Sequence, residues 1–390
     1  MFSKTFKAFP FLMVFFALGF LFYNIQSKND IDKTLVVADP IDYMLAQRLY
    51  PYGEADKKAY HEALELSQEK MELRSAIPIG NWELRGPFNV GGRITDIEMP
   101  YNSSSTIYAG SASGGVYKSI NAGESFKPIF DEATSLSIGD LDISETDTNI
   151  VYVGTGEANA GGGSLAYDGY GVYKSDNGGL TWQHLGLEEV GSIGKVVISK
   201  QDPNKVYVAA MGELFKNNQE RGVYKTTDGG QSWEQVLYIS DSTGVIDLVI
   251  HPEDDDIVYA AAWERIRRPY NRQYGGSTTG IFKSTNGGQD WSELTSGLPS
   301  SKLEKGRIGL AIARSQPDML YAYYVTAFGN NQGIYRSTNG GQTWQLRGLT
   351  GLTNVSFGWW FGKIEVDPKS PNRVYLTQLN MFRSENGGTS

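Results

Sequence analysis

The chain contains no cysteine and only three histidines among its 390 residues. Without cysteine it can form neither disulfides nor zinc–thiolate sites, and it has neither a thiolate nucleophile nor an amino-terminal cysteine for lipid attachment. His61, His184 and His251 do not have the spacing of metal ligands or of a catalytic triad. We therefore expect no metal and no cofactor.

Positive charge is also in deficit, because 44 Asp and Glu outnumber 35 Lys and Arg and give a formal net charge of -9. A surface of this sign repels phosphates, so nucleic acid is not an expected partner. Glycine, in contrast, is abundant: 46 residues exceed the usual share of roughly 7%. This excess predicts many tight turns.

The amino terminus resembles an export signal. Lys4 and Lys7 precede an apolar run of 18 residues over 8–25, and residues 25–27 form an acceptable cleavage site. Residues 1–27 are therefore predicted to be a signal peptide or, if uncleaved, a membrane anchor and the only contact with a membrane. Either outcome predicts an exported protein that is secreted, periplasmic or held at the cell surface.

Residues 28–80 differ in composition from the rest of the chain. The segment 56–74 is poor in glycine, and Ala59, Ala63, Leu66 and Met71 share one face of a helix. We predict a helical linker or pro-segment over 28–80.

One stretch recurs through the remainder, 81–390. It reads Gly-Val-Tyr-Lys-Ser-Asp-Asn-Gly-Gly-Leu-Thr-Trp at 171–182, with similar text at 115–126, 222–233, 280–291 and 333–344 and a partial copy from 381. The final aromatic residues are spaced by 56, 51, 58 and 53 residues. A repeat near 50 residues with several strands per unit is typical of a propeller.

Each unit shows four short strands separated by turns. In the second unit they are expected at 138–144, 149–155, 171–175 and 181–185. The predicted fold class is therefore all-β, a β-propeller of four-stranded antiparallel blades. Six blades start here, the sixth is incomplete at the C-terminus, and seven or more are expected in a longer protein. Residues 82–85 resemble a spare fourth strand.

The repeated turn resembles the Asp-box, or BNR repeat, Ser-x-Asp/Asn-x-Gly-x-Thr/Ser-Trp, of sialidases, family 74 xyloglucanases and sortilin-type receptors. The sequence of residues 82–94 resembles the opening of exported bacterial BNR-repeat proteins. In the boxes, Asn or Asp accepts backbone hydrogen bonds, Gly supplies a positive φ, and Trp is an apolar anchor. The predicted structural residues are Ser175, Asn177, Gly179, Trp182, Asp228, Gly230, Trp233, Asn286, Gly288, Trp291, Asn339, Gly341 and Trp344.

A ligand site is expected on the face opposite the boxes. The loops between second and third strands, and between blades, are irregular, and function concentrates on such loops. Aromatic residues with arginines suit a polysaccharide or an extended peptide, although the same surface could pack against a second propeller of the same protein. The candidates are Tyr167, Tyr170, Trp263, Arg265, Arg267, Arg268, Tyr270, Trp359 and Trp360.

The resemblance also implies a second function, glycoside hydrolysis, which needs two carboxylates roughly 5–9.5 Å apart. Candidates are Glu157, Asp168 and Glu264; the alternative role for Glu157 is to satisfy loop N–H groups or pair with Arg265. The family patterns are not met, since Thr95 follows Arg93-Ile94 where sialidases have Pro, and Ala112 occupies the position of the family 74 Asp. We therefore expect a binding scaffold, with a hydrolase and a structural surface domain as alternatives.

Overall fold

The computed structural model describes residues 57–74, 91–159, 168–213, 216–267, 272–348, 352 and 357–390. The chain divides into two units, 1–60 and 61–390, and the strands all belong to the second. The predicted helix is present as α3 (Lys57–Arg74). No helix in this described part is both long and apolar enough to cross a membrane. The predicted signal or anchor, 1–27, and the spare strand, 82–85, lie outside the described residues.

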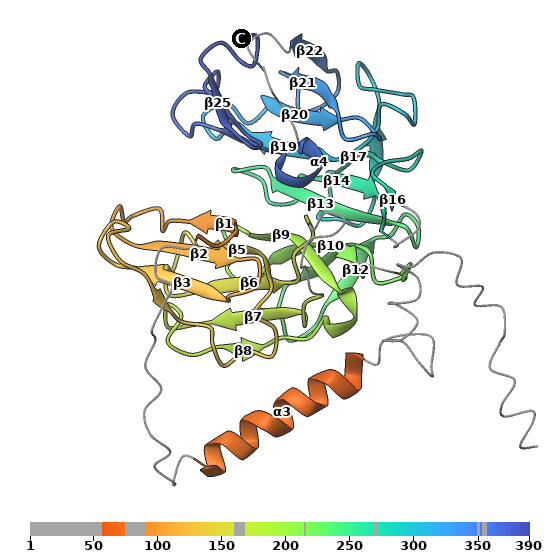
Figure 1. Ribbon diagram of the computed structural model, residues 1–390. Coiled ribbons are helices and arrows are strands. Elements are labelled where there is room, and N and C mark those ends of the chain that lie inside the picture. The colour runs from red at the N-terminus through yellow and green to blue at the C-terminus, as the bar shows by residue number, and fades with distance from the viewer. Residues whose placement is uncertain are drawn as a thin grey trace, which may run out of the picture. The chain divides into compact units, whose positions relative to one another are not determined.

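The second unit is a six-bladed β-propeller of antiparallel sheets (Figure 1). The first three blades run in chain order from their inner to their outer strand. They consist of β1 (Ile94–Glu98), β2 (Ile107–Ser111), β3 (Val116–Ser119) and β4 (Lys127–Pro128); β5 (Ile138–Ile143), β6 (Val151–Thr155), β7 (Val172–Ser175) and β8 (Gln183–His184); and β9 (Ser192–Ile198), β10 (Val206–Gly212), β11 (Gly222–Thr226) and β12 (Glu234–Leu237).

The last three blades follow the same plan, except that the sixth has three strands among the described residues. They consist of β13 (Thr243–Ile250), β14 (Val258–Glu264), β17 (Gly280–Ser284) and β18 (Ser292–Leu294); β19 (Ile308–Ile312), β20 (Leu320–Val325), β21 (Asn331–Ser337) and β22 (Gln345–Gly348); and β23 (Lys363–Val366), β24 (Val374–Thr377) and β25 (Met381–Ser384). Between them lie η1 (Glu188–Val190), the hairpin β15 (Ile266–Arg267) and β16 (Arg272–Gln273), and α4 (Gly358–Phe361).

The blades pack through their second strands, which are almost wholly apolar and buried. β10 and β14 are fully or nearly fully buried along their length, as is β20. Such strands are covered on both faces by neighbouring blades, so their sequences are continuously apolar instead of alternating between apolar and polar residues. Fourth strands are short and largely exposed, which explains why the sequence pattern is weakest there.

Each Asp-box is held by the same short hydrogen bonds. In the second blade the amide of Gly179 donates to Ser175 Oγ over 2.8 Å, and the amide of Thr181 donates to Asn177 Oδ1 over 2.9 Å. Gly179 has a φ of 89°, in the region that favours glycine. The box therefore satisfies its own backbone groups, the structural role that its residue types predict.

The box tryptophans reach two kinds of partner. The indole N–H of Trp182 donates to Ile129 O in the preceding blade over 2.7 Å, and that of Trp233 donates to Leu185 O over 2.8 Å. In later blades, Trp291 and Trp344 donate instead to a glycine carbonyl of their own turn. The anchor thus ties neighbouring blades in one half of the ring and braces its own turn in the other.

Inner strands join the blades around the ring. β5 contacts β1 and β9, β13 contacts β9 and β19, and β19 contacts β23. Lys363 Nζ, on β23, donates to Thr95 O over 3.0 Å and to Asp96 Oδ1 over 3.1 Å, both on β1. The sixth blade therefore contacts the first.

Candidate functional site

Glu157, the foremost carboxylate candidate, is fixed inside the loop face. It follows β6 after Gly156, whose φ is 87°, and it is 1% exposed. Its carboxylate accepts two hydrogen bonds from the guanidinium of Arg93, from Nε over 2.8 Å and from Nη2, and its amide donates to Ser137 Oγ. The partner is therefore Arg93, and not the Arg265 that the sequence suggested. A buried carboxylate held this way serves first as an anchor.

Arg93 links this carboxylate to a run of aromatic rings on the same face. Its guanidinium carbon lies 5.5 Å from the ring centroid of Trp360, within the range of a cation–π interaction. Trp360 stacks on Phe361 with centroids 5.0 Å apart and planes 10° apart, and on Trp359 at 5.5 Å. Rings and guanidinium together form one stacked cluster around Trp360.

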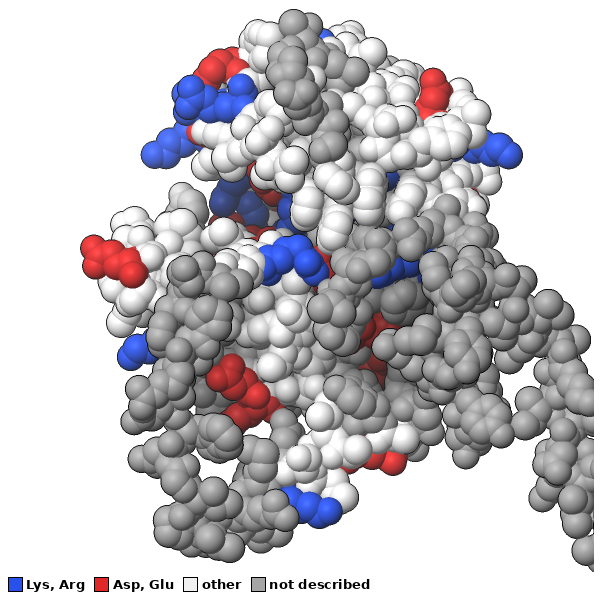
Figure 2. Space-filling model, viewed as in Figure 1, with Lys and Arg blue, Asp and Glu red and all other residues white. Residues whose placement is uncertain are grey.

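This cluster borders a cleft of about 580 Å³ where the sixth blade meets the first. Its volume lies within the roughly 300–1,000 Å³ of small-molecule sites. Figure 2 shows basic and acidic side chains close together in a recess on this face. The lining residues include Arg93, Asp96, Glu157, Asn159, Trp360, Phe361, Lys363, Glu365, Thr377 and Gln378.

Two polar atoms of the cleft residues lack hydrogen-bond partners although they are buried. They are Trp360 Nε1, a donor, and Gln378 Oε1, an acceptor. The amide nitrogen of Gln378 is occupied, because it donates to the hydroxyl of Tyr323. Buried polar groups are normally satisfied, so each such atom calls for an explanation. A hydroxyl or amide group, which both donates and accepts, could satisfy either atom.

Trp263 and Arg265, two of the predicted candidates of the fourth blade, are buried braces, and Arg267 is buried as well. Trp263 is fully buried, and its N–H donates to Tyr274 O over 2.8 Å. Arg265 and Arg307 approach its ring at 4.9 and 5.9 Å. Arg265 also donates to Ala158 O, and Arg307 donates to Asn159 Oδ1. Trp263 therefore has no exposed face to offer a ligand, contrary to its predicted role.

Burial of these cations has an electrostatic consequence. Burial, with the nearby Arg267 and Arg307, lowers the pKa of Arg265 to about 9. Burial likewise lowers the pKa of Arg307 to about 10. Both remain charged at neutral pH and hold the loop after β6 in place. They act on the cleft through Asn159, which lines it.

The other predicted residues have separate positions. Glu264 accepts hydrogen bonds from Thr278 N and Oγ1 and from Gln273 Nε2, so it supports its own loop. Tyr170 stacks on His184, with centroids 4.9 Å apart. Asp168 and Trp359 are half-buried. Tyr167, Arg268 and Tyr270 lie outside the described residues. The structure thus brings together Glu157 and Trp360, with Arg93 between them.

Sequence reasoning missed the aspartates of the inner strands, of which Asp96 lines the cleft. Asp96 Oδ2 accepts the amide of Leu141, Asp140 Oδ2 that of Val196, and Asp247 Oδ2 that of Leu310, each in the next blade. Burial and the neighbouring Asp96 raise the pKa of Asp140 to about 7. The available signal was an Asp in each of these three inner strands, at the third position of β1 and β5 and at the fifth of β13.

Comparisons with known proteins agree with this architecture. Residues 170–332 match the Sortilin-Vps10 model ("Sortilin, neurotensin receptor 3"), and residues 335–346 match the BNR/Asp-box repeat. A xyloglucanase of Paenibacillus sp. is 25% identical over 341 residues, which cover 77% of this chain and 31% of that protein. Xyloglucanase Xgh74A of Acetivibrio thermocellus is 22% identical over 296 residues, covering 63% and 33%.

A crystal structure of an ancestral GH74 enzyme has the same fold. It superposes with a TM-score of 0.58 and 22% identity, covering 78% of this chain and 37% of that one. The chain therefore spans about a third of the length of the curated relatives that it matches.

Proposed function

We propose that this chain, an Asp-box β-propeller related to the sortilin-Vps10 family and to GH74 xyloglucanases, is an exported scaffold that binds a neutral polysaccharide in the cleft beside Trp360. The observation that carries the proposal is the combination of the aromatic cluster around Trp360, which lines the cleft, with unpartnered Trp360 Nε1 and Gln378 Oε1. A sugar unit presents an apolar face to a ring and hydroxyls to polar atoms.

An uncharged ligand suits the cleft better than an ionic one. Arg93 is paired with Glu157, and Lys363 is paired with Asp96 and Asp140, so these cations are already neutralised. A charged ligand would have to compete with these internal partners. An extended peptide offers amides in place of hydroxyls and is the second ligand class that this lining would accept. The names of the xyloglucanase relatives favour the polysaccharide.

Binding is tested by affinity electrophoresis of the full chain in gels containing xyloglucan, a second neutral glucan or an acidic polysaccharide. Trp360→Ala removes the stacking ring, and Leu180→Ala is the matched control, because Leu180 is 82% exposed at an Asp-box. Loss of an anchoring aromatic costs about 2 kcal/mol or more. We therefore expect Trp360→Ala to weaken xyloglucan binding about 30-fold, and Leu180→Ala to leave it unchanged. Equal retardation of the two variants would contradict the proposal.

Glycoside hydrolysis is the second candidate, favoured by the similarity to xyloglucanases. Glu157 would have to act from within its pair with Arg93, and Glu264 from within its bonds to Thr278 and Gln273. Release of reducing ends from xyloglucan, abolished by Glu157→Gln, would replace binding by catalysis as the function. Release that persists in Glu157→Gln would point to other carboxylates.

A further inference from the structure

Three arginines from three different blades hold three consecutive residues of the loop after β6. The pairs are Arg93 with the carboxylate of Glu157, Arg265 with Ala158 O, and Arg307 with Asn159 Oδ1. Arg265 and Arg307 are 6% and 2% exposed. Cations are costly to bury because they lose their hydration. A loop that is held by such groups is rigid, and rigid placement of side chains is what a binding site requires.

Asn159 lines the cleft with only one end of its amide engaged. Its Oδ1 accepts from Arg307 Nη1. A guanidinium can only donate, so this bond fixes the amide with its oxygen toward Arg307 and leaves Nδ2 for the cleft. Among the described residues, Nδ2 has no hydrogen-bond partner. The cleft is therefore lined by a donor group whose orientation is fixed.

The same guanidinium also fixes the backbone that carries Trp360. Arg307 Nη1 donates to Trp360 O over 3.2 Å, and Nε donates to Gly362 O over 3.2 Å. The guanidinium carbon lies 5.9 Å from the ring centroid of Trp263, which packs against it. One buried side chain therefore sets the positions of Asn159 and of α4, and both of these line the cleft.

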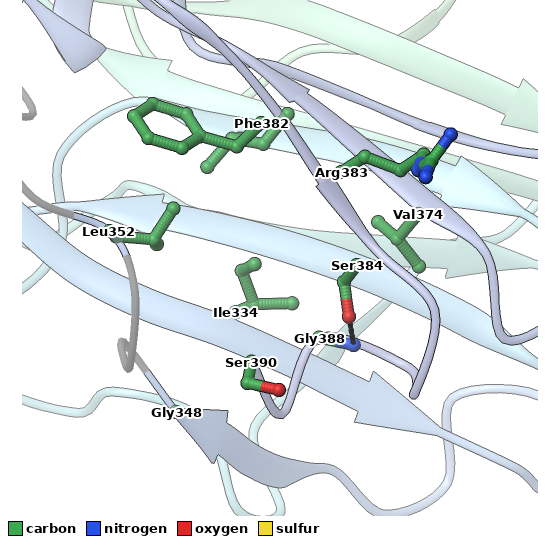
Figure 3. Close-up of a pocket in the computed structure, with 10 residues that line it drawn as sticks. Ile334, Gly348, Leu352, Val374, Phe382, Arg383, Ser384, Gly388 and Ser390 are labelled. Carbon is green, nitrogen blue, oxygen red and sulfur yellow. Dashed lines mark hydrogen bonds between the residues drawn. The ribbon is translucent and has the colours of Figure 1, made fainter.

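The asparagines of the Asp-boxes show how a structural amide is used. Asn177 Oδ1 accepts from Thr181 N over 2.9 Å, and Nδ2 donates to Thr181 Oγ1 over 2.8 Å. The last box has the same turn, in which Gly388 N donates to Ser384 Oγ over 2.9 Å (Figure 3). A box amide is thus satisfied at both ends within its own turn. Turn chemistry alone does not account for Asn159, whose Nδ2 is left for another partner.

We propose that Asn159 is a specificity-determining residue of the cleft, that its Nδ2 donates to an oxygen of the bound ligand, and that Arg307 positions it for this bond. This inference rests on the proposed binding of a neutral polysaccharide in the cleft. With Trp360 Nε1 and Gln378 Oε1, the cleft then presents two donors and one acceptor. A matching ligand supplies at least two acceptors and one donor, as the hydroxyl and ring oxygens of a sugar do.

Asn159→Asp separates a ligand contact from a structural role. The aspartate keeps an oxygen for Arg307 but replaces the donor Nδ2 with a second acceptor. Asn159→Ala removes both groups. Asn204→Asp is the matched control, because Asn204 is exposed beside the third Asp-box, where its carbonyl accepts from Gly229 N. Each full-chain variant is compared with wild type by affinity electrophoresis in xyloglucan gels, and its thermal midpoint is measured.

We expect Asn159→Asp to weaken xyloglucan binding about tenfold, as for the loss of one hydrogen bond, and to keep the wild-type thermal midpoint. Asn159→Ala should weaken binding as much and also lower the midpoint, because Arg307 loses an acceptor. Asn204→Asp should match wild type in both measurements. Unchanged binding by Asn159→Asp, or weaker binding with a midpoint as low as that of Asn159→Ala, would overturn the ligand contact.

Arg307→Lys tests the positioning role. Lysine keeps the positive charge but lacks the planar array of donors that reaches three acceptors. The variant should weaken binding. The double variant Asn159→Ala/Arg307→Lys should bind several-fold better than the product of the two single losses predicts, because both changes act on the same contact. Losses that simply multiply would refute the positioning role.

Trp360→Ala in the same gels distinguishes this inference from the proposed function. If Trp360→Ala loses binding while Asn159→Asp keeps it, polysaccharide binding in the cleft stands and the role of Asn159 is refuted. If xyloglucan does not retard the wild-type chain, both are refuted.

Discussion

Removal of Arg93 and removal of Glu157, which form an ion pair, are expected to lower the free energy of unfolding by different amounts. The side chain of Glu157 is 1% exposed, whereas that of Arg93 is 30% exposed. Removing one partner of a buried pair costs about 3–5 kcal/mol, because the other charge is left uncompensated. Arg93→Met leaves the buried carboxylate of Glu157 without a counter-charge, so this variant should lose the full value for a buried pair, about 3–5 kcal/mol. Glu157→Gln leaves the guanidinium of Arg93 without a counter-charge, but water reaches that group. Because solvent screens the charge, this variant should lose only about 1–2 kcal/mol of unfolding free energy.

The double variant Arg93→Met/Glu157→Gln separates pairing from packing. Because no charge remains uncompensated, its loss of stability should be smaller than the sum of the two single losses by at least about 1.5 kcal/mol. Urea unfolding at pH 7, followed by tryptophan fluorescence, measures these differences. Arg373→Met is the control, because its exposed pair with Glu385 should shift the midpoint little. Additive losses, or an Arg93→Met variant no less stable than Arg373→Met, would refute the assignment of Glu157 as a buried anchor.

Three further outcomes are expected. Burial raises the pKa of Asp142 to about 6 from its ordinary value of 3.8. The stability that this group contributes is therefore complete below pH 3.8 and is lost as the pH rises through 6. Asp142→Asn should remove this dependence, so that the free energy of unfolding changes less between about pH 4 and 6. Gly139→Ala would place a Cβ 2.0 Å from Ile193 O and should prevent stable folding, whereas Gly91→Ala, with nothing within 4 Å, should leave the thermal midpoint unchanged. Thr226→Ala removes the hydroxyl that accepts from Gly230 N and should lower the unfolding free energy by about 1–3 kcal/mol, whereas Ser292→Ala, at an exposed hydroxyl, should not.

The repeat sequence was sufficient to predict the propeller. Strands expected at 138–144, 149–155 and 171–175 appear as β5, β6 and β7, because glycine turns and apolar text dictate them locally. Six blades are present in the described part of the chain, as predicted, while seven or more blades in a longer protein stays a prediction. The predicted and observed bounds differ most for the fourth strands, because few buried residues define these strands.

The candidate site was predicted only in part, because it depends on contacts between distant residues. Glu157 and Trp360 were identified as loop residues, but Arg93, which joins them, lies 64 residues before Glu157. Trp263 was predicted to bind ligand because it begins an irregular loop that combines aromatic residues with arginines, yet Arg265 and Arg267 of that loop are buried with it. Gln378 is a single amide in a short loop, and nothing in its local sequence indicates an unpartnered oxygen. Long-range packing decides all of these positions.

A crystal structure of the full chain with a xyloglucan oligosaccharide is the most direct test of polysaccharide binding in the cleft. We expect a sugar ring stacked on Trp360, with hydroxyls within hydrogen-bond distance of Trp360 Nε1 and Gln378 Oε1. An oligosaccharide bound at the Asp-box turns on the opposite face, with the cleft unchanged, would contradict it.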